Sequence, residues 1–305
     1  MVAAPHRHHP AVVRVSSTLP ICYLNGAYLQ LSEARVSPLD RAFLFGDAVY
    51  EVIPVYRGRP FRLREHLDRL NRSLAAIRMP APRSHPEWAA ICAELAAPCG
   101  EADCHIYIQV SRGAEHGRNH AWPEGLTPTL FAYVTALDPL PAAMLEQGVP
   151  AVTALDIRWA RRDIKSTALL ANILLKKMAA DAGAFETMML ENGDLTEGSS
   201  TAVHVISDGV IHAPPNGHHI LPGTTRDVVS ELAARLKMDC ITSRVPEAML
   251  RSADEIWLSF ATRGVLPVTL LDGRAVGSGK PGPMFKRMHA AFVDFTRELA
   301  GTPAL

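Results

Sequence analysis

A single lysine, Lys165, stands at the junction of two different stretches of sequence. Residues 156–164 before it are rich in arginine and show little helical pattern. After it, Ser166 or Thr167 can cap a helix whose apolar face is formed by Leu169, Leu170, Ile173 and Leu174. A lysine just before a helix is partly withdrawn from water and lies near the positive end of the helix dipole, and both effects disfavour its ammonium form. A free amine can attack a carbonyl carbon and form a Schiff base, whereas the alternative is a solvated surface lysine.

Composition limits the classes of protein to which the chain can belong. Its 305 residues are 48% hydrophobic and 20% charged, which predicts a sizeable core in one large domain or two ordinary ones. Lys and Arg together number 31, as do Asp and Glu, so the net charge does not favour nucleic acid or an acidic membrane as a partner. Five cysteines without a C-x-x-C pair favour reduced thiols and a cytoplasmic location. Apolar runs are shorter than the roughly 18–20 residues of a membrane span, and residues 1–20 are expected to be a flexible extension rather than a signal peptide.

Turn signals and hydrophobic spacing predict an α/β chain with two domains, residues 21–137 and 138–305. Asn25–Gly26 and Arg57–Gly58 are expected to be hairpin turns. The prolines of residues 137–142 are typical of an interdomain connection. Other predicted strands span residues 104–111, 130–134, 150–155, 186–190, 201–207, 209–212, 240–245 and 255–259, and predicted helices span residues 63–77, 86–97, 221–235 and 284–299.

Two groups in this chain are suited to binding a phosphate. Gly223–Thr224–Thr225 opens a predicted helix, where backbone N–H groups and the helix dipole favour an anion and the two hydroxyls add donors. An ordinary threonine N-cap is the alternative. Arg69 can make a bidentate contact with a phosphate, or else form a surface ion pair with Glu65.

Three further positions are candidates for contacts with a ring-shaped cofactor and a carboxylate substrate. Glu197 follows a predicted turn and could keep a pyridine nitrogen protonated, or it could be a solvated turn residue. Arg118 and His120 lie one residue apart on a polar loop and could hold a substrate carboxylate, with a solvated loop as the alternative. Tyr50 stands in a predicted strand, where its ring is either part of the core or close enough to reach the same carboxylate.

Five stretches, residues 45–52, 65–70, 163–166, 195–200 and 221–226, resemble the branched-chain and D-amino acid aminotransferase family in content, order and spacing. The resemblance covers about residues 21–300. It implies the fold type IV architecture of pyridoxal 5'-phosphate enzymes, with two α/β domains and the cofactor between them. It further implies a Schiff base at Lys165, Glu197 opposite the ring nitrogen and Leu221 against the ring. The phosphate would be held by Arg69, Thr224, Thr225 and the loop containing Ala261.

Within that family, the chain most resembles the D-amino acid transaminases. Tyr50, Arg118 and His120 stand where those enzymes trap the substrate carboxylate, the last two from a neighbouring subunit, and residues 156–159 are similar as well. The resemblance implies a homodimer that transaminates D-alanine and D-glutamate with 2-oxo acids by a ping-pong mechanism. The alternatives are an L-branched-chain or (R)-amine transaminase and aminodeoxychorismate lyase on the same scaffold, and a catalytically silent binding protein.

One stretch departs from the family pattern. Residues 259–263 stand where relatives usually carry a loop rich in serine and threonine. Phe260 and Ala261 remove hydroxyls from that loop, and Arg263 is expected to place a charge near the site.

Overall fold

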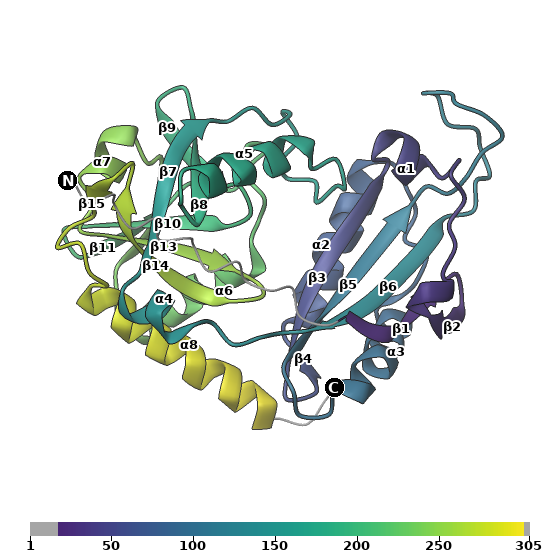
Figure 1. Cartoon of the computed structure of the whole chain (residues 1–305), viewed down its shortest axis with the longest axis horizontal. Helices are drawn as coiled ribbons and strands as arrows, with labels where there is room; N and C mark the ends of the chain where they lie inside the picture. The colour runs from purple at the N-terminus through teal and green to yellow at the C-terminus, as the bar shows by residue number, and fades with distance from the viewer. Residues whose placement is uncertain (1–17, 302–305) are drawn as a thin grey trace, which may run out of the picture.

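The computed structural model describes residues 18–301, and two β-sheets with their own helices account for most of them (Figure 1). The strands of the first sheet run in the order β2-β1-β6-β5-β3-β4, and every neighbouring pair is antiparallel. Its strands are β1 (Thr18–Leu24), β2 (Ala27–Gln30), β3 (Ala48–Tyr56), β4 (Arg59–Pro60), β5 (Cys104–Ser111) and β6 (Thr129–Ala136). The helices of this part are α1 (Arg41–Phe45), α2 (Leu63–Ala76) and α3 (His85–Ala96), with short 3₁₀ turns at Leu31–Glu33 and Ala97–Cys99.

Both predicted hairpin turns are confirmed in this sheet. Asn25 and Gly26 have φ angles of 51° and 100°, and Arg57 and Gly58 have 49° and 74°. Two successive positive φ values match the right-handed twist of the flanking strands, which is why such turns favour asparagine and glycine.

The helices over the first sheet follow the predicted spacing. Leu67, Leu70 and Leu74 of α2 are buried in one hydrophobic cluster with residues of β3 and β5. Helix α3 begins at a capping box in which Ser84 and Glu87 each accept a hydrogen bond from the other's backbone N–H. The predicted helices at residues 63–77 and 86–97 are therefore confirmed.

The second sheet has nine strands, in the order β12-β11-β10-β13-β14-β7-β8-β9, with β15 beside β14. The pairs β11–β12, β14–β7 and β7–β8 are parallel and the others are antiparallel. Its strands are β7 (Val149–Leu155), β8 (Glu186–Glu191), β9 (Asp194–Gly198), β10 (Ala202–Ser207), β11 (Val210–Ala213), β12 (Cys240–Thr242), β13 (Glu255–Phe260), β14 (Gly264–Leu271) and β15 (Arg274–Ala275). The helices are α4 (Ala142–Glu146), α5 (Leu170–Asp181), α6 (Thr224–Arg235), α7 (Glu247–Arg251) and α8 (Pro283–Gly301).

Alternate residues of the central strands bury their side chains in different cores. In β13, Ile256 and Leu258 belong to one cluster, whereas Trp257 packs in another with residues of α6 and α8. Successive side chains of a strand point to opposite faces, so the sheet is covered on both sides. Helices α6 and α8 thus define the face on which Trp257 and its alternate neighbours lie.

The predicted helix after Lys165 is present, but its predicted start is wrong. Helix α5 begins at Leu170, and neither Ser166 nor Thr167 caps it. Residues 165–167 instead run beside β3, where the Tyr50 N–H donates to the Lys165 carbonyl (2.9 Å) and the Thr167 N–H donates to the Ala48 carbonyl (3.0 Å). These backbone bonds hold the segment extended, and Lys165 therefore does not stand at the helix end.

The predicted apolar face of α5 is also not buried within the chain. Leu170, Ile173 and Leu174 are 70%, 61% and 55% exposed. Spacing identifies an apolar stripe correctly but does not say which surface covers it.

We propose that the boundary between the two domains lies at residues 137–138, directly after β6. Every strand of the first sheet precedes this point and every strand of the second follows it. Residues 1–17 of the expected N-terminal extension lie outside the described residues, and Thr18–Pro20 already belongs to β1. Within residues 18–301, no helix is long and apolar enough to cross a membrane.

Candidate active site

A cavity of about 1190 Å³ lies where the two domains meet. Its wall includes Tyr50 and Arg69 from the first domain, Glu197 and Thr224 from the second, and Lys165 from the segment that runs beside β3. The predicted residues Leu221, Thr225 and Ala261 also line it. Candidate residues from widely separated stretches of the sequence therefore line one cavity.

Backbone contacts fix Lys165 against the first domain. Its N–H donates to Ser73 Oγ at 3.2 Å, and its carbonyl accepts from the Tyr50 N–H. The Nζ atom lies 4.4 Å from the centroid of the Tyr50 ring. The structure thus places the predicted amine and the predicted tyrosine side by side at the cavity.

Glu197 is buried in β9, and its carboxylate contacts the guanidinium of Arg158. Arg158 Nη1 lies 2.5 Å from Glu197 Oε1, and the Leu221 N–H is 3.2 Å from Oε1 and 3.4 Å from Oε2. Burial raises the pKa of Glu197, and the Arg158 guanidinium opposes that rise. The guanidinium hydrogen bond goes to Oε1, which leaves Oε2 able to accept a hydrogen bond from a ligand in the cavity.

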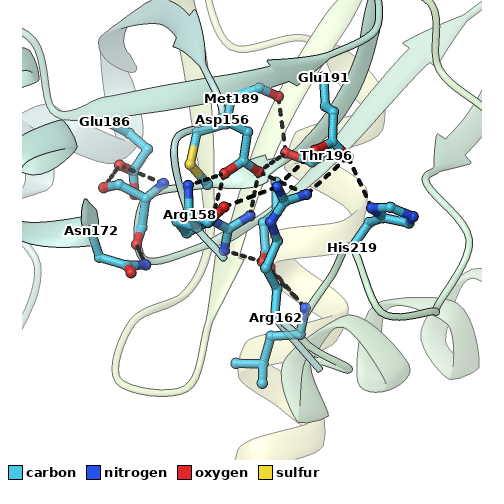
Figure 2. A network of polar contacts seen from close by, with 12 residues as sticks. Asp156, Arg158, Arg162, Asn172, Glu186, Met189, Glu191, Thr196 and His219 are labelled. Atoms are coloured by element: carbon cyan, nitrogen blue, oxygen red, sulfur yellow. Dashed lines mark hydrogen bonds and ion pairs between the residues drawn. The ribbon is translucent and has the colours of Figure 1, made fainter. Parts of the chain in front are cut away.

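A chain of charged groups holds Arg158 in place (Figure 2). Asp156 accepts hydrogen bonds from Arg158 Nε (3.0 Å) and Nη2 (2.7 Å), and from the Thr196 hydroxyl (2.7 Å). Arg162 approaches Asp156 at 3.5 Å and binds Glu191 at 2.8 Å. A buried guanidinium held by two carboxylates keeps a fixed position, and so Glu197 faces a fixed charge.

Hydrogen-bond donors gather around the start of α6, in another part of the cavity wall from Glu197. Gly223 is the N-cap residue and provides no side-chain cap, so the first-turn N–H groups keep their capacity to bind an anion. Thr224 and Thr225 are buried there, and Thr224 Oγ1 lies 3.2 Å from His66 Nε2. Helix dipole, N–H groups and hydroxyls together suit an anion such as a phosphate.

Arg69 adds a buried positive charge to this end of the cavity. The predicted alternative, an ion pair between Arg69 and Glu65, is wrong, because Glu65 pairs with Arg62. Arg69 instead binds both oxygens of Glu51, at 2.7 and 2.8 Å. Burial alone would raise the pKa of Glu51, but the Arg69 guanidinium brings that pKa well below its usual range. Arg69 Nη1 also donates to the Pro222 carbonyl (2.8 Å), which ties the first domain to the loop before α6.

Arg118 and His120 do not line the cavity of their own chain. Both are exposed and lie beside the Phe45 ring, at 5.0 Å from the Arg118 Cζ and 5.4 Å between ring centroids for His120. Buried Arg41 anchors the backbone of their loop by donating to the carbonyls of Asn119 (2.7 Å) and His120 (3.1 Å). The loop is thus held at its backbone while its two side chains stay exposed.

The stretch that departs from the family pattern, residues 259–263 at the end of β13 and in the turn to β14, lies only partly at the site. Phe260 and Ala261 line the cavity. The expectation for Arg263 is wrong, because this side chain does not line the cavity and instead donates to the Asp138 carbonyl in the interdomain connection. The turn directs Arg263 away from the site, so its charge is not available to a ligand there.

Comparison with known proteins identifies the family. Residues 48–271 match the amino-transferase class IV family, which is most of the chain. The chain belongs to this family. The aminotransferase is 39% identical over 267 residues to a D-alanine aminotransferase of Bacillus licheniformis, covering 88% of this chain and 94% of the relative. It is 38% identical over 271 residues to the D-alanine aminotransferase of Staphylococcus aureus strain MW2, covering 88% and 95%.

Solved structures of aminotransferases share the fold. The branched-chain amino acid aminotransferase of Escherichia coli matches with a TM-score of 0.85 and 28% identity, covering 90% of this chain and 94% of that one. The T.th. branched-chain amino acid aminotransferase with pyridoxamine 5'-phosphate matches with a TM-score of 0.85 and 27% identity, covering 90% and 93%. The family resemblance and the two-domain α/β fold predicted from the sequence are therefore confirmed.

Several residues of the aminotransferase site were not predicted individually. Arg158 lies in a stretch noted for its similarity, but its contact with Glu197 joins two elements that no sequence spacing connects. Buried Glu186 accepts hydrogen bonds from both the N–H and the hydroxyl of Ser199 and of Ser200, and it thereby fixes the loop that follows Glu197. A glutamate in a predicted strand carries no local signal for such a role.

Proposed function

We propose that this aminotransferase moves amino groups between D-amino acids, such as D-alanine and D-glutamate, and 2-oxo acids, using pyridoxal 5'-phosphate. The observation that carries the proposal is the convergence of Lys165, Glu197 with Arg158, and the uncapped start of α6 on one cavity. The two D-alanine aminotransferases at 38–39% identity support the choice of D-amino acids.

The donors around the cavity fit the proposed cofactor. Lys165 would hold it covalently through Nζ, and Glu197 Oε2 would accept a hydrogen bond from the ring nitrogen. Thr224 and Thr225 suit the phosphate group, and Arg69 lines the same end of the cavity with its charge paired to Glu51. When bound there, the cofactor supplies a conjugated ring that accepts the electron pair of a breaking Cα–H bond.

The chain's own groups would carry out the remaining work. Lys165 Nζ would take the proton from the substrate Cα as a general base and then, as a general acid, deliver it to the cofactor carbon that keeps the amino nitrogen, not back to Cα. The Arg158 guanidinium opposes the burial that raises the pKa of Glu197 and so favours the carboxylate form, which can stabilise a protonated ring nitrogen. The second half of the reaction reverses these steps with a 2-oxo acid, which implies ping-pong kinetics.

We propose that a second copy of the chain completes the substrate site. Large apolar side chains surround the mouth of the cavity and are exposed in the single chain: Phe43, Ile157, Trp159, Leu170, Ile173 and Leu174. An apolar surface of this kind is typical of a covered interface. In a dimer that covers it, Arg118 and His120 of one copy would reach the other's cavity and hold the substrate carboxylate together with Tyr50.

Mixing two inactive variants tests this arrangement. We expect Lys165→Ala and Arg118→Ala each to lose most activity with D-alanine. After the two are dissociated and reassociated in equal amounts, half of the dimers are mixed, and each mixed dimer has one intact site. Activity should therefore return to about a quarter of wild type.

The same mixture distinguishes the two possible positions of Arg118. If Arg118 served its own chain, every site with Lys165 would lack Arg118, and no activity would return. Sedimentation of the mixture, and of each variant alone, shows whether dimers are present in each case.

A branched-chain L-amino acid transaminase is the second candidate function, because solved enzymes of that type share the fold. Incubation with D-alanine or L-leucine, each with 2-oxoglutarate, separates the two. The proposal predicts that pyruvate forms from D-alanine and that no 4-methyl-2-oxopentanoate forms from L-leucine. The reverse result would favour the second candidate.

We also propose a cytoplasmic location. All five cysteines, Cys22, Cys92, Cys99, Cys104 and Cys240, are free thiols in the structure. Unpaired cysteines are typical of proteins that stay in a reducing compartment.

A further inference from the structure

Two buried polar side chains beside α6 have no part in the mechanism described so far. Ser259 lies in β13, is 2% exposed and lines the cavity. His204 lies in the adjacent strand β10 and is fully buried, with its Nε2 at 2.9 Å from Ser259 Oγ.

Strand geometry places Ser259 at the start of α6. Ser259 follows Trp257 by two residues, so its side chain lies on the face that α6 covers. Its partner in β10 is Ala202, and a Cβ at Gly223 would lie 3.8 Å from the Ala202 side chain. Gly223 is the N-cap of α6. Ser259 therefore lies on the α6 side of the sheet, beside the strand residue that packs against the N-cap of this helix.

The direction of the His204–Ser259 hydrogen bond follows from the surroundings of the imidazole. Burial, with the nearby Arg226 guanidinium, lowers the pKa of His204 to about 3, so the ring is neutral at pH 7 and carries one N–H. Nδ1 has no hydrogen-bond partner among the described residues. Buried N–H groups without an acceptor are rare, so the proton is assigned to Nε2. Nε2–H then donates to Ser259 Oγ, and the Ser259 O–H is free to donate to a ligand.

We propose that Ser259 donates its hydroxyl to the cofactor phosphate and that His204 is the positioning residue that orients it. This inference rests on the proposed function. Ala261, two residues further along and also on the cavity wall, brings only a methyl group. An anion at the start of α6 gains from each hydroxyl donor that faces it, and Ser259 supplies one where Ala261 cannot.

Cofactor affinity tests the role of Ser259 without reference to turnover. The full-length chain is freed of cofactor and titrated with pyridoxal 5'-phosphate and, separately, with pyridoxal, which lacks the phosphate. Ser259→Ala should raise the Kd for pyridoxal 5'-phosphate roughly tenfold to hundredfold, the range for a hydrogen bond to a charged group, and leave the Kd for pyridoxal unchanged. Adding Ala261→Thr to Ser259→Ala should recover part of the lost affinity, because it returns a hydroxyl to the same loop.

His204→Leu tests the positioning role. It should weaken pyridoxal 5'-phosphate binding less than Ser259→Ala does, and the double variant should bind as weakly as Ser259→Ala alone, because both act through one hydroxyl. Losses that add up in the double variant would contradict this positioning role.

Three results would overturn the inference. Equal affinity of wild type and Ser259→Ala for pyridoxal 5'-phosphate excludes Ser259 as a phosphate donor. Equal weakening of pyridoxal and pyridoxal 5'-phosphate assigns it a structural role only. A wild-type chain that binds neither pyridoxal 5'-phosphate nor inorganic phosphate contradicts the proposed function itself, and this inference with it.

Discussion

Replacing Lys165 with alanine should reduce the rate of amino transfer by roughly 10⁴-fold or more, because the variant loses both the covalent holder of the cofactor and the general base. We expect the variant to keep its fold, because the backbone of residue 165, and not its side chain, forms the hydrogen bonds to Tyr50 and Ser73. The measurement is the single-turnover rate of oxo acid formation from D-alanine.

Lys176 provides a matched control for this variant. It is a second lysine on the cavity wall, but its side chain is 44% exposed and lies 3.6 Å from Glu186. Lys176→Arg removes a primary amine while keeping the charge beside Glu186, and most activity should remain. If Lys165→Ala kept near-normal turnover while Lys176→Arg lost it, the reactive lysine would be Lys176 and the account of Lys165 would be wrong.

Glu197→Gln should lower kcat by about 10²–10³-fold, the usual cost of removing one preorganised electrostatic contact. A neutral amide beside Arg158 cannot hold a protonated ring nitrogen, so a breaking Cα–H bond would lose its electron acceptor. The visible spectrum of the cofactor-loaded variant should shift as well, because the ring nitrogen changes its protonation.

Glu191→Gln is the control for Glu197→Gln. Glu191 also carries a guanidinium partner, Arg162, but its side chain is 29% exposed and lies further along the charged chain (Figure 2). We expect a loss of less than tenfold, consistent with a partly exposed ion pair. Equal losses in the two variants would show that Glu197 acts only as a structural carboxylate.

Local signals were enough to find the parts of the site that depend on one stretch of chain. The glycine before Thr224 marks a helix start, and the free N–H groups and dipole of a helix start favour an anion. Lys165, Glu197 and Tyr50 stand in stretches whose order and spacing resemble the family. All of these residues line one cavity in the structure.

Contacts between distant stretches could not be predicted in the same way. Arg158 and Glu197 are 39 residues apart, and Glu51 and Arg69 are 18 apart on different elements. Spacing pointed to Glu65 as the partner of Arg69 because it lies one helical turn away, but a helix presents each residue to several neighbours and tertiary packing selects Glu51. The sequence position of Arg263 predicts a charge near the site, whereas the turn directs this side chain to the interdomain connection.

The α5 helix shows a different limit. Its hydrophobic spacing was correct, but the stripe of Leu170, Ile173 and Leu174 is exposed rather than buried in its own chain. Periodicity describes the side chains of one helix and carries no information about whether the covering surface belongs to the same molecule or to another.

The visible absorbance of the cofactor-loaded protein, recorded before and after D-alanine and L-leucine are added separately, tests the central claim most directly. The account predicts that D-alanine alone converts the band of the lysine-bound cofactor into that of its aminated form. Conversion by L-leucine alone would contradict the assignment to D-amino acids, and the absence of any band after pyridoxal 5'-phosphate is supplied would contradict the role of Lys165 itself.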